Sequence, residues 1–239
     1  MANLIARQRY MEVSDSGTMW DGFKIGIPGL YNKYDNDFHQ WTADSWTITE
    51  VDVGAGASTQ TLLDVANGVL SLTSAQNEDD GNQIQLGGTG DGETTGEGFA
   101  PVAGKNIYFE TRVRSSLVTQ HDFFLGLHVE DTTIIAGRGA DYIGFRTDDG
   151  DANLDVESAA SSSASDIAAI ATLVNSTWIK LGFKVTGTTK ADFWVNDALT
   201  NTISSDIPTA LMKLSIAQLA VAAAATELDI DYVRIYQEV

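Results

Sequence analysis

Residues 227–239 read ELDIDYVRIYQEV, and this stretch decides how the rest of the chain is interpreted. Glu227, Asp229 and Asp231 lie two residues apart, so in a β-strand their side chains would share one face. The alternation predicts a strand whose acidic edge faces solvent. The strands that pair with it must come earlier in the sequence.

Four longer stretches alternate in the same way. A period of two residues is typical of antiparallel strands that bury one face. Their apolar rows are Ile107, Phe109, Thr111 and Val113; Phe123, Leu125, Leu127 and Val129; Ile179, Leu181, Phe183 and Val185; and Met212, Leu214 and Ile216. Shorter candidates fill the gaps, at residues 46–51, 69–73, 83–86, 142–146, 153–157, 192–195 and 201–204.

Turn residues separate these segments, as in TDDGDAN (147–153) and VNDA (195–198). The Ser- and Ala-rich residues 157–175 lack such a pattern and are interpreted as a loop with one short helix. About a dozen strands without a sustained helical period predict an all-β fold. We expect two antiparallel sheets packed as a jelly-roll β-sandwich.

Composition narrows the expected partners. The 239-residue chain has a formal net charge of −19, which repels nucleic acid and anionic lipid, so neither is expected to bind. It has no cysteine for disulfides or thiolate metal sites, and no apolar run approaches a membrane span. The first residues, MANLIARQRYMEV, show no apolar signal-peptide segment, so we expect synthesis in the cytoplasm.

Residues 1–40 are nearly neutral and irregular, yet rich in large apolar side chains. We interpret them as an N-terminal arm, followed by one sandwich domain at residues 41–239. Two interpretations stay open for what buries the arm: this chain's own sandwich or a neighbouring subunit. Aromatic and arginine side chains dominate interface hot spots, so they are the expected anchors on a partner. These are Arg7, Arg9, Tyr10, Trp20, Phe23 and Tyr31.

LDIDYVRIYQ (residues 228–237) resembles the last strand of the concanavalin A-like lectin and glucanase superfamily, whose laminarinase-type members end on a similar run. WIKLGFKVTGTTKADFWVNDAL (residues 178–199) is similar to a strand and hairpin of the same scaffold. The resemblance covers roughly residues 106–237 and implies the concanavalin A-like jelly roll. It implies no particular activity, because one fold hosts many functions.

The glucanase branch of that superfamily carries its acid/base and its nucleophile on one mid-chain strand, commonly as Glu-x-Asp-x-x-Glu or Glu-x-Asp-x-Glu. A retaining mechanism needs two carboxyls ~5–5.5 Å apart. Glu130 and Asp131 are neighbours that would face opposite ways, and Asp155 and Glu157 have no third member. The acidic residues at 227–231 lie in the closing strand. On these grounds we predict that the chain is not an enzyme.

Two kinds of binding site fit the sequence in part. Calcium takes six to eight oxygen ligands, and Asp148, Asp149 and Asp151 are the candidates for a loose loop site, with a solvated acidic turn as the alternative. Exposed aromatic rings stack on sugars, which makes Trp178 and Trp194 the carbohydrate candidates, with core packing as the alternative. His39, His121 and His128 are interpreted as ordinary residues, either at the surface or with satisfied hydrogen bonds.

An aromatic arm before an acidic, lectin-like sandwich resembles in organisation the capsid decoration (cement) proteins of tailed-bacteriophage heads. The resemblance implies a structural protein of the virion. It would bind the major capsid protein on the outer capsid surface as a homotrimer and stabilise capsomer junctions. The alternative is a non-catalytic, lectin-like carbohydrate-binding module with a glycan as its partner, which a virion could also display.

Overall fold

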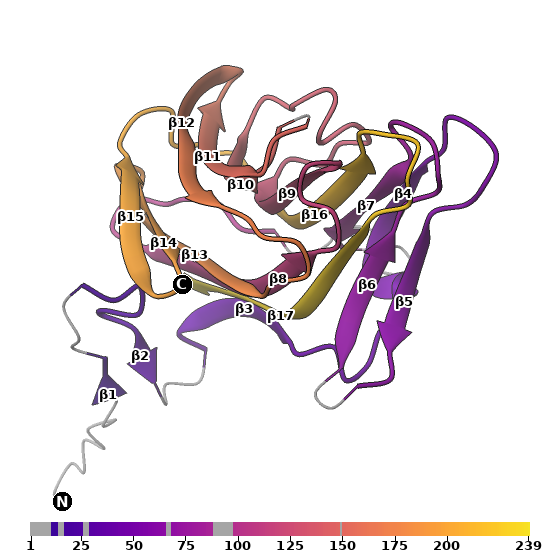
Figure 1. The fold of residues 1–239 in the computed structure, drawn as a ribbon. Coiled ribbons are helices and arrows are strands. Elements are labelled where there is room, and N and C mark those ends of the chain that lie inside the picture. Colours follow the sequence, from indigo (N-terminus) through magenta and orange to yellow (C-terminus); the bar gives the residue numbers. More distant parts are fainter. Residues whose placement is uncertain (1–10, 14–16, 26–28, 66–67, 88–97, 149) are drawn as a thin grey trace, which may run out of the picture.

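The computed structural model describes residues 11–13, 17–25, 29–65, 68–87, 98–148 and 150–239 (Figure 1). No helix within these residues is long and apolar enough to cross a membrane. The described elements are β1 (Met11–Glu12), β2 (Lys24–Ile25), β3 (Tyr31–Asn36), the 3-10 helix η1 (Ala43–Ser45), β4 (Trp46–Val51), β5 (Thr59–Leu63), β6 (Val69–Thr73), β7 (Gly81–Leu86), β8 (Asn106–Ser115), β9 (His121–His128), β10 (Tyr142–Arg146), β11 (Asn153–Ala160), β12 (Ser163–Thr172), β13 (Ile179–Thr186), β14 (Lys190–Val195), β15 (Ala198–Ile203), β16 (Lys213–Ala220) and β17 (Glu227–Glu238).

Two large sheets pack against each other (Figure 1). One has seven strands in the order β12-β11-β10-β9-β16-β7-β4. The other has eight: seven in the order β15-β14-β13-β8-β17-β6-β5, and β3, which pairs with β17 off this path. Their neighbouring strands run antiparallel. The predicted all-β, two-sheet antiparallel sandwich is therefore confirmed, with the closing strand β17 at the middle of the eight-stranded sheet.

The core lies between the sheets, where alternation turns one row of each strand inward. Phe109 of β8 stacks on Phe183 of β13 with 4.7 Å between ring centroids. From the other sheet, Phe145 of β10 meets Phe193 of β14 edge to face at 5.5 Å. All four rings are fully buried, and the apolar rows predicted from the sequence supply much of the same core.

Residues 157–175 do not form the predicted loop with a short helix. They contribute to the hairpin of β11 and β12, in which Ala160 pairs with Ser163. The turn therefore has two residues, Ser161 and Ser162, with φ of 53° and 69°. Positive φ at both positions is the type I′ geometry of two-residue hairpins, which Asn, Asp or Gly usually signals. The prediction was wrong because serine gives no such signal.

The described part of the N-terminal arm packs on the outer face of the eight-stranded sheet. Trp20 stacks on Tyr108 at 5.8 Å between ring centroids, and its Nε1 donates to the carboxylate of buried Glu110 at 3.2 Å. β3 pairs with β17 from Tyr31 to Asn36. This is contact with the chain's own sandwich. Docking on another subunit, and the division into 1–40 and 41–239, stay predictions.

Candidate functional site

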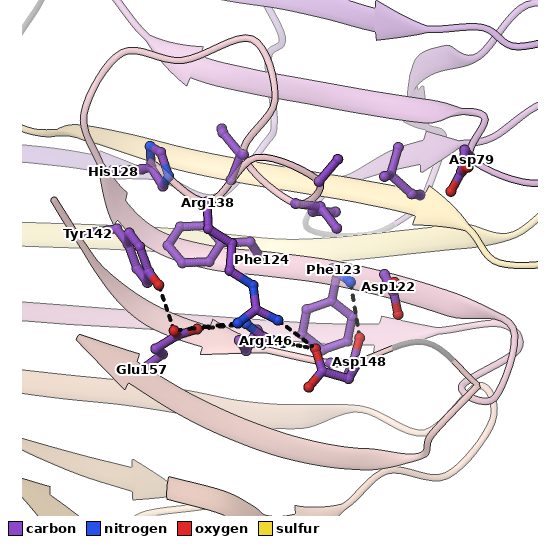
Figure 2. A pocket seen from close by; sticks show the side chains of 15 residues that line it. Asp79, Asp122, Phe123, Phe124, His128, Arg138, Tyr142, Arg146, Asp148 and Glu157 are labelled. Carbon is purple, nitrogen blue, oxygen red and sulfur yellow. Dashed lines mark hydrogen bonds and ion pairs between the residues drawn. The ribbon is translucent and has the colours of Figure 1, made fainter. Parts of the chain in front are cut away.

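A cavity of about 360 Å³ opens on the outer face of the seven-stranded sheet (Figure 2). Its wall follows from strand alternation, because residues next to the core-facing rows must point outward. It also includes residues of the loop between β9 and β10. The side chains that carry the chemistry are Asp122, Phe124 and His128 from β9, Tyr142 and Arg146 from β10, and Glu157 from β11.

Glu157 is fixed by the strand beside it. It lies opposite Gly144 of β10, which has no side chain to block it. Glu157 therefore contacts the two residues that flank Gly144 on the same face. Tyr142 Oη donates to Glu157 Oε1 at 2.5 Å, and Arg146 Nη1 donates to Oε2 at 2.7 Å. A Cβ at Gly144 would also lie 2.9 Å from the Phe124 ring, so this glycine is needed for the packing of the cavity.

Two arginines and two carboxylates form an ion-pair network across the cavity. Arg146 binds Glu157 through Nη1 and Asp148 through Nη2. Arg138, on the β9–β10 loop, lies 3.3 Å from Asp148 and 3.7 Å from Glu157, and Figure 2 shows its guanidinium directed toward both. Arg146 and Glu157 are nearly buried, whereas the side chains of Arg138 and Asp148 are 51% and 54% exposed. The inner pair is thus fixed and the outer pair is open to a ligand.

His128 and Tyr142 form the aromatic part of the wall, with parallel rings 5.4 Å apart. His128 Nδ1 donates to the Val129 carbonyl at 2.6 Å, and Nε2 accepts from the Gly139 N–H at 3.2 Å. Burial lowers the pKa of His128, so the imidazole is neutral at neutral pH. Burial, and then the bond to Glu157, raise the pKa of Tyr142, which keeps its hydroxyl a donor.

The predicted carbohydrate residues Trp178 and Trp194 do not line this cavity. The guanidinium groups of Arg112 and Arg114 lie 4.8 and 4.7 Å from the centre of the Trp178 ring, on the outer face of the other sheet. Trp194 is buried, and its Nε1 donates to the Gly17 carbonyl at 3.2 Å. A role of either tryptophan in sugar binding stays a prediction.

Of the six predicted partner anchors, Arg7, Arg9 and Tyr10 lie outside the described residues. Trp20, Phe23 and Tyr31 belong to one aromatic cluster with Tyr108 and Tyr236, in which the rings of Phe23 and Tyr31 stack at 4.6 Å. All three side chains remain partly exposed there. Their contact with a partner stays a prediction.

The calcium candidates are dispersed. Asp149 lies outside the described residues, and Asp148 pairs with the two arginines of the cavity. Asp151 instead accepts from the backbone N–H and from the Nδ2 of Asn153, both at 2.8 Å. Across the described ranges, His, Asp and Glu side chains nowhere gather in a group of three that could hold a metal ion.

Tyr142, Arg146 and His128 were not predicted as site residues from the sequence. Alternation shows that they point away from the core rows of their strands. It does not show which strand lies beside which, so Glu157 could not be placed between Tyr142 and Arg146. The sequence signal for a site would have been a strand whose outward-facing side chains are polar or aromatic. It occurs on several strands and does not single out this face.

No family model and no curated protein matches the sequence. Solved structures do match. The laminarinase catalytic domain from Thermotoga maritima aligns with a TM-score of 0.60 and 9% identity, covering 86% of this chain and 98% of that one. The β-glucanase of Bacillus licheniformis gives 0.59 and 10%, covering 85% and 97%. A β-1,3-glucanase from Mycobacterium marinum gives 0.58 and 12%, covering 87% and 100%. The concanavalin A-like jelly roll is thus the fold of this chain.

The prediction that the chain is not an enzyme is contradicted by this comparison, because the similar structures are glycoside hydrolases. At such identities the likeness shows the fold, and the activities are those of the neighbours. The prediction rested on carboxyls spaced along a single strand. The cavity instead collects Asp122 from β9, Asp148 from the loop between β10 and β11, and Glu157 from β11.

Proposed function

We propose that the cavity on the seven-stranded sheet binds a carbohydrate. The proposal rests on one observation: aromatic rings and fixed charged groups line the same small cavity. Ligand sites combine apolar surface with a few placed polar groups in this way. Two structures of the same fold hold sugars: a Bacteroides ovatus GH16 protein with a G4G4G3G product, and the kappa-carrageenase of Pseudoalteromonas carrageenovora with an oligotetrasaccharide.

The cavity offers both kinds of contact that a sugar makes. Phe124, His128 and Tyr142 line the cavity as an apolar wall, with 1–4% of each residue exposed, so a sugar would meet this wall at the bottom of the cavity and not an open ring face. Sugar hydroxyls both donate and accept hydrogen bonds. The half-exposed Arg138 is a donor for them and the half-exposed Asp148 is an acceptor.

The charge of the cavity favours a neutral glycan. Four carboxylates line it, those of Asp79, Asp122, Asp148 and Glu157, against two arginines. The net charge of −19 on the whole chain adds to the repulsion of anionic polymers. Sulfated or uronic-acid chains are therefore disfavoured relative to neutral β-glucans.

Titration calorimetry with neutral β-1,3- and β-1,3-1,4-gluco-oligosaccharides tests the proposal, with sulfated carrageenan oligosaccharides as the charged comparison. We expect the neutral sugars to bind and Arg138→Ala to weaken binding about tenfold, since a charged hydrogen bond contributes ~1.5–3 kcal/mol. The matched control is Arg112→Ala, which removes a half-exposed arginine paired with Asp231 at 2.9 Å on the other sheet. No binding, or equal losses in both variants, would overturn the proposal.

The same samples report whether the bound sugar is cleaved, through the release of new reducing ends. Tyr142 Oη and Arg146 Nη1 hold the Glu157 carboxylate in one position, and a nucleophile or charge-stabilising group must be fixed in this way. Cleavage that disappears in Glu157→Gln while binding persists would add hydrolysis to the proposed function.

We also propose capsid decoration as a second function, with the partly exposed aromatic cluster of the arm as its support. In this role the chain would bind the major capsid protein as a homotrimer on the virion surface. Sedimentation with undecorated capsids tests it. Pelleting that is lost in Trp20→Ala supports the role, and a protein that never pellets contradicts it.

A further inference from the structure

The loop between β9 and β10, residues 129–141, lies over β16 and β7 on the face where the cavity opens. Its Ile134 is buried against Phe124 of β9 and Ala217 of β16. Ala217 points to the outer face, yet it is fully buried because the loop lies over it. A glycan that lies across the strands toward β16 and β7 would collide with this loop.

Two buried glutamines of β7 hold the loop in place. Gln83 accepts from the Ile134 N–H at 2.5 Å and donates to the Thr132 carbonyl. Gln85 accepts from the Asp131 N–H at 2.9 Å and donates to the Val129 carbonyl at 3.1 Å. Both side chains replace backbone partners that the loop lacks. Leaving such groups unpaired costs about 1–3 kcal/mol each, so the loop is a fixed wall.

The same loop closes the inner end of the cavity. It leaves β9 directly after His128 and returns to β10 directly before Tyr142. The Val129 N–H donates to the Asp141 carbonyl at 3.0 Å, and the Gly139 N–H donates to His128 Nε2. The stacked His128 and Tyr142 rings therefore stand where the cavity ends along the strands.

The opposite end is an acidic mouth. Asp79 and Asp148 line the cavity there and are exposed. Asp122 lies beside Leu219 of β16 at the same end of the strands. The Asp79 N–H donates to the Ala220 carbonyl at 2.7 Å, which fixes this rim against β16.

We propose that this dead-end shape makes the protein bind the ends of neutral glycan chains rather than their internal segments. The inference rests on the carbohydrate binding proposed above. One or two terminal sugars fill the cavity against Tyr142 and His128, and the rest of the chain leaves over Asp79 and Asp148. A volume of about 360 Å³ lies at the small end of ligand pockets, which span about 300–1,000 Å³.

Binding capacity measured at constant sugar mass tests the inference on the unmodified protein. A soluble neutral β-1,3-glucan is compared with the same glucan cut to about one-tenth of its chain length. Binding to ends predicts that sites per gram rise about tenfold. An unchanged number of sites per gram overturns the inference and leaves carbohydrate binding intact. The absence of any binding overturns both.

A variant with a loosened loop gives a second, independent readout. In Gln83→Ala/Gln85→Ala the wall over β16 and β7 opens, and we expect at least a threefold gain in binding to the long glucan per gram. Gln60→Ala is the control, since Gln60 bonds Asn82 through its side chain and does not touch the loop. A folded double variant without this gain contradicts the inference. If the double variant does not fold, the chain-length comparison decides.

Discussion

At the scale of single residues, the position of Glu157 depends on the strand beside it. Gly144 leaves the space that the Glu157 side chain crosses, and Tyr142 and Arg146 stand on either side to bind it. A buried ion pair contributes little net stability. Removing Glu157 is still costly, because the nearly buried Arg146 keeps only the half-exposed Asp148 as its partner and Tyr142 Oη loses its acceptor.

Replacing Glu157 should therefore lower stability as well as ligand binding. We expect Glu157→Ala to reduce the free energy of unfolding by about 3 kcal/mol in urea denaturation. Glu130→Ala serves as control, because Glu130 is 66% exposed and pairs with Lys213 at the surface, where a pair contributes ~0–1 kcal/mol. Similar losses in the two variants would contradict the reading of Glu157 as a buried partner.

His121 should set the response of stability to mild acid. Its Nδ1 lies 2.7 Å from Ser115 Oγ, and burial lowers its pKa from 6.5 to about 4. Between these values the unfolded chain binds more protons, so the free energy of unfolding falls as pH drops from 6.5 to 4, by about 3 kcal/mol. The lowered pKa of Asp80 acts below 3.8, outside this window.

The check is urea unfolding at several pH values between 4 and 7. His121→Gln should flatten the slope of stability against pH relative to the unmodified protein, whatever its effect on stability at pH 7. The lowered pKa of His128 acts in the same direction and remains in the variant. Identical slopes would show that His121 is not the residue responsible.

At the scale of elements, two hairpins show what the sequence could predict. The β14–β15 turn is Asn196–Asp197, with φ of 49° and 67°, and its residue types signalled it. The Ser161–Ser162 turn has similar φ values and was missed. The strands themselves followed from alternation. The cavity did not, because it depends on cross-strand neighbours and on a loop anchored by distant glutamines.

The serine turn offers a way to raise stability. Ser161→Asn/Ser162→Gly places residues that tolerate positive φ where it is needed, and should add about 0.5–1 kcal/mol. That corresponds to about 1–4 °C in Tm for a chain of this size. The reverse change, Asn196→Ser/Asp197→Ser, should lower Tm. Calorimetric scans in which the two variants shift the same way would refute the argument.

The arm should open locally when its central ring is removed. Trp20 contacts Phe23, Tyr108 and Tyr236 and bonds Glu110. We expect Trp20→Ala to increase hydrogen exchange at least tenfold for the amides of residues 22 and 23, which donate within the arm. Trp178→Ala, on another part of the sheet, should leave these amides unchanged. Equal protection in both variants would mean that the ring does not hold the arm.

At the scale of the whole molecule, net charge is the property that follows most directly from the sequence. A net charge of −19 destabilises the compact state through self-repulsion, and salt screens it over about 10 Å at 0.1 M. Raising NaCl from 0.02 to 0.5 M should therefore increase Tm by several degrees in a thermal scan. A Tm that is constant or falls would show that the fixed ion pairs outweigh the repulsion.

The central claim concerns one face of the sandwich, and a crystal structure with a neutral β-1,3-linked tetrasaccharide tests it most directly. We expect a terminal sugar in the cavity against Tyr142 and His128, with the rest of the glycan leaving over Asp79 and Asp148. Sugar bound at Trp178 or elsewhere on the eight-stranded sheet, with no sugar in the cavity, would overturn the proposed site.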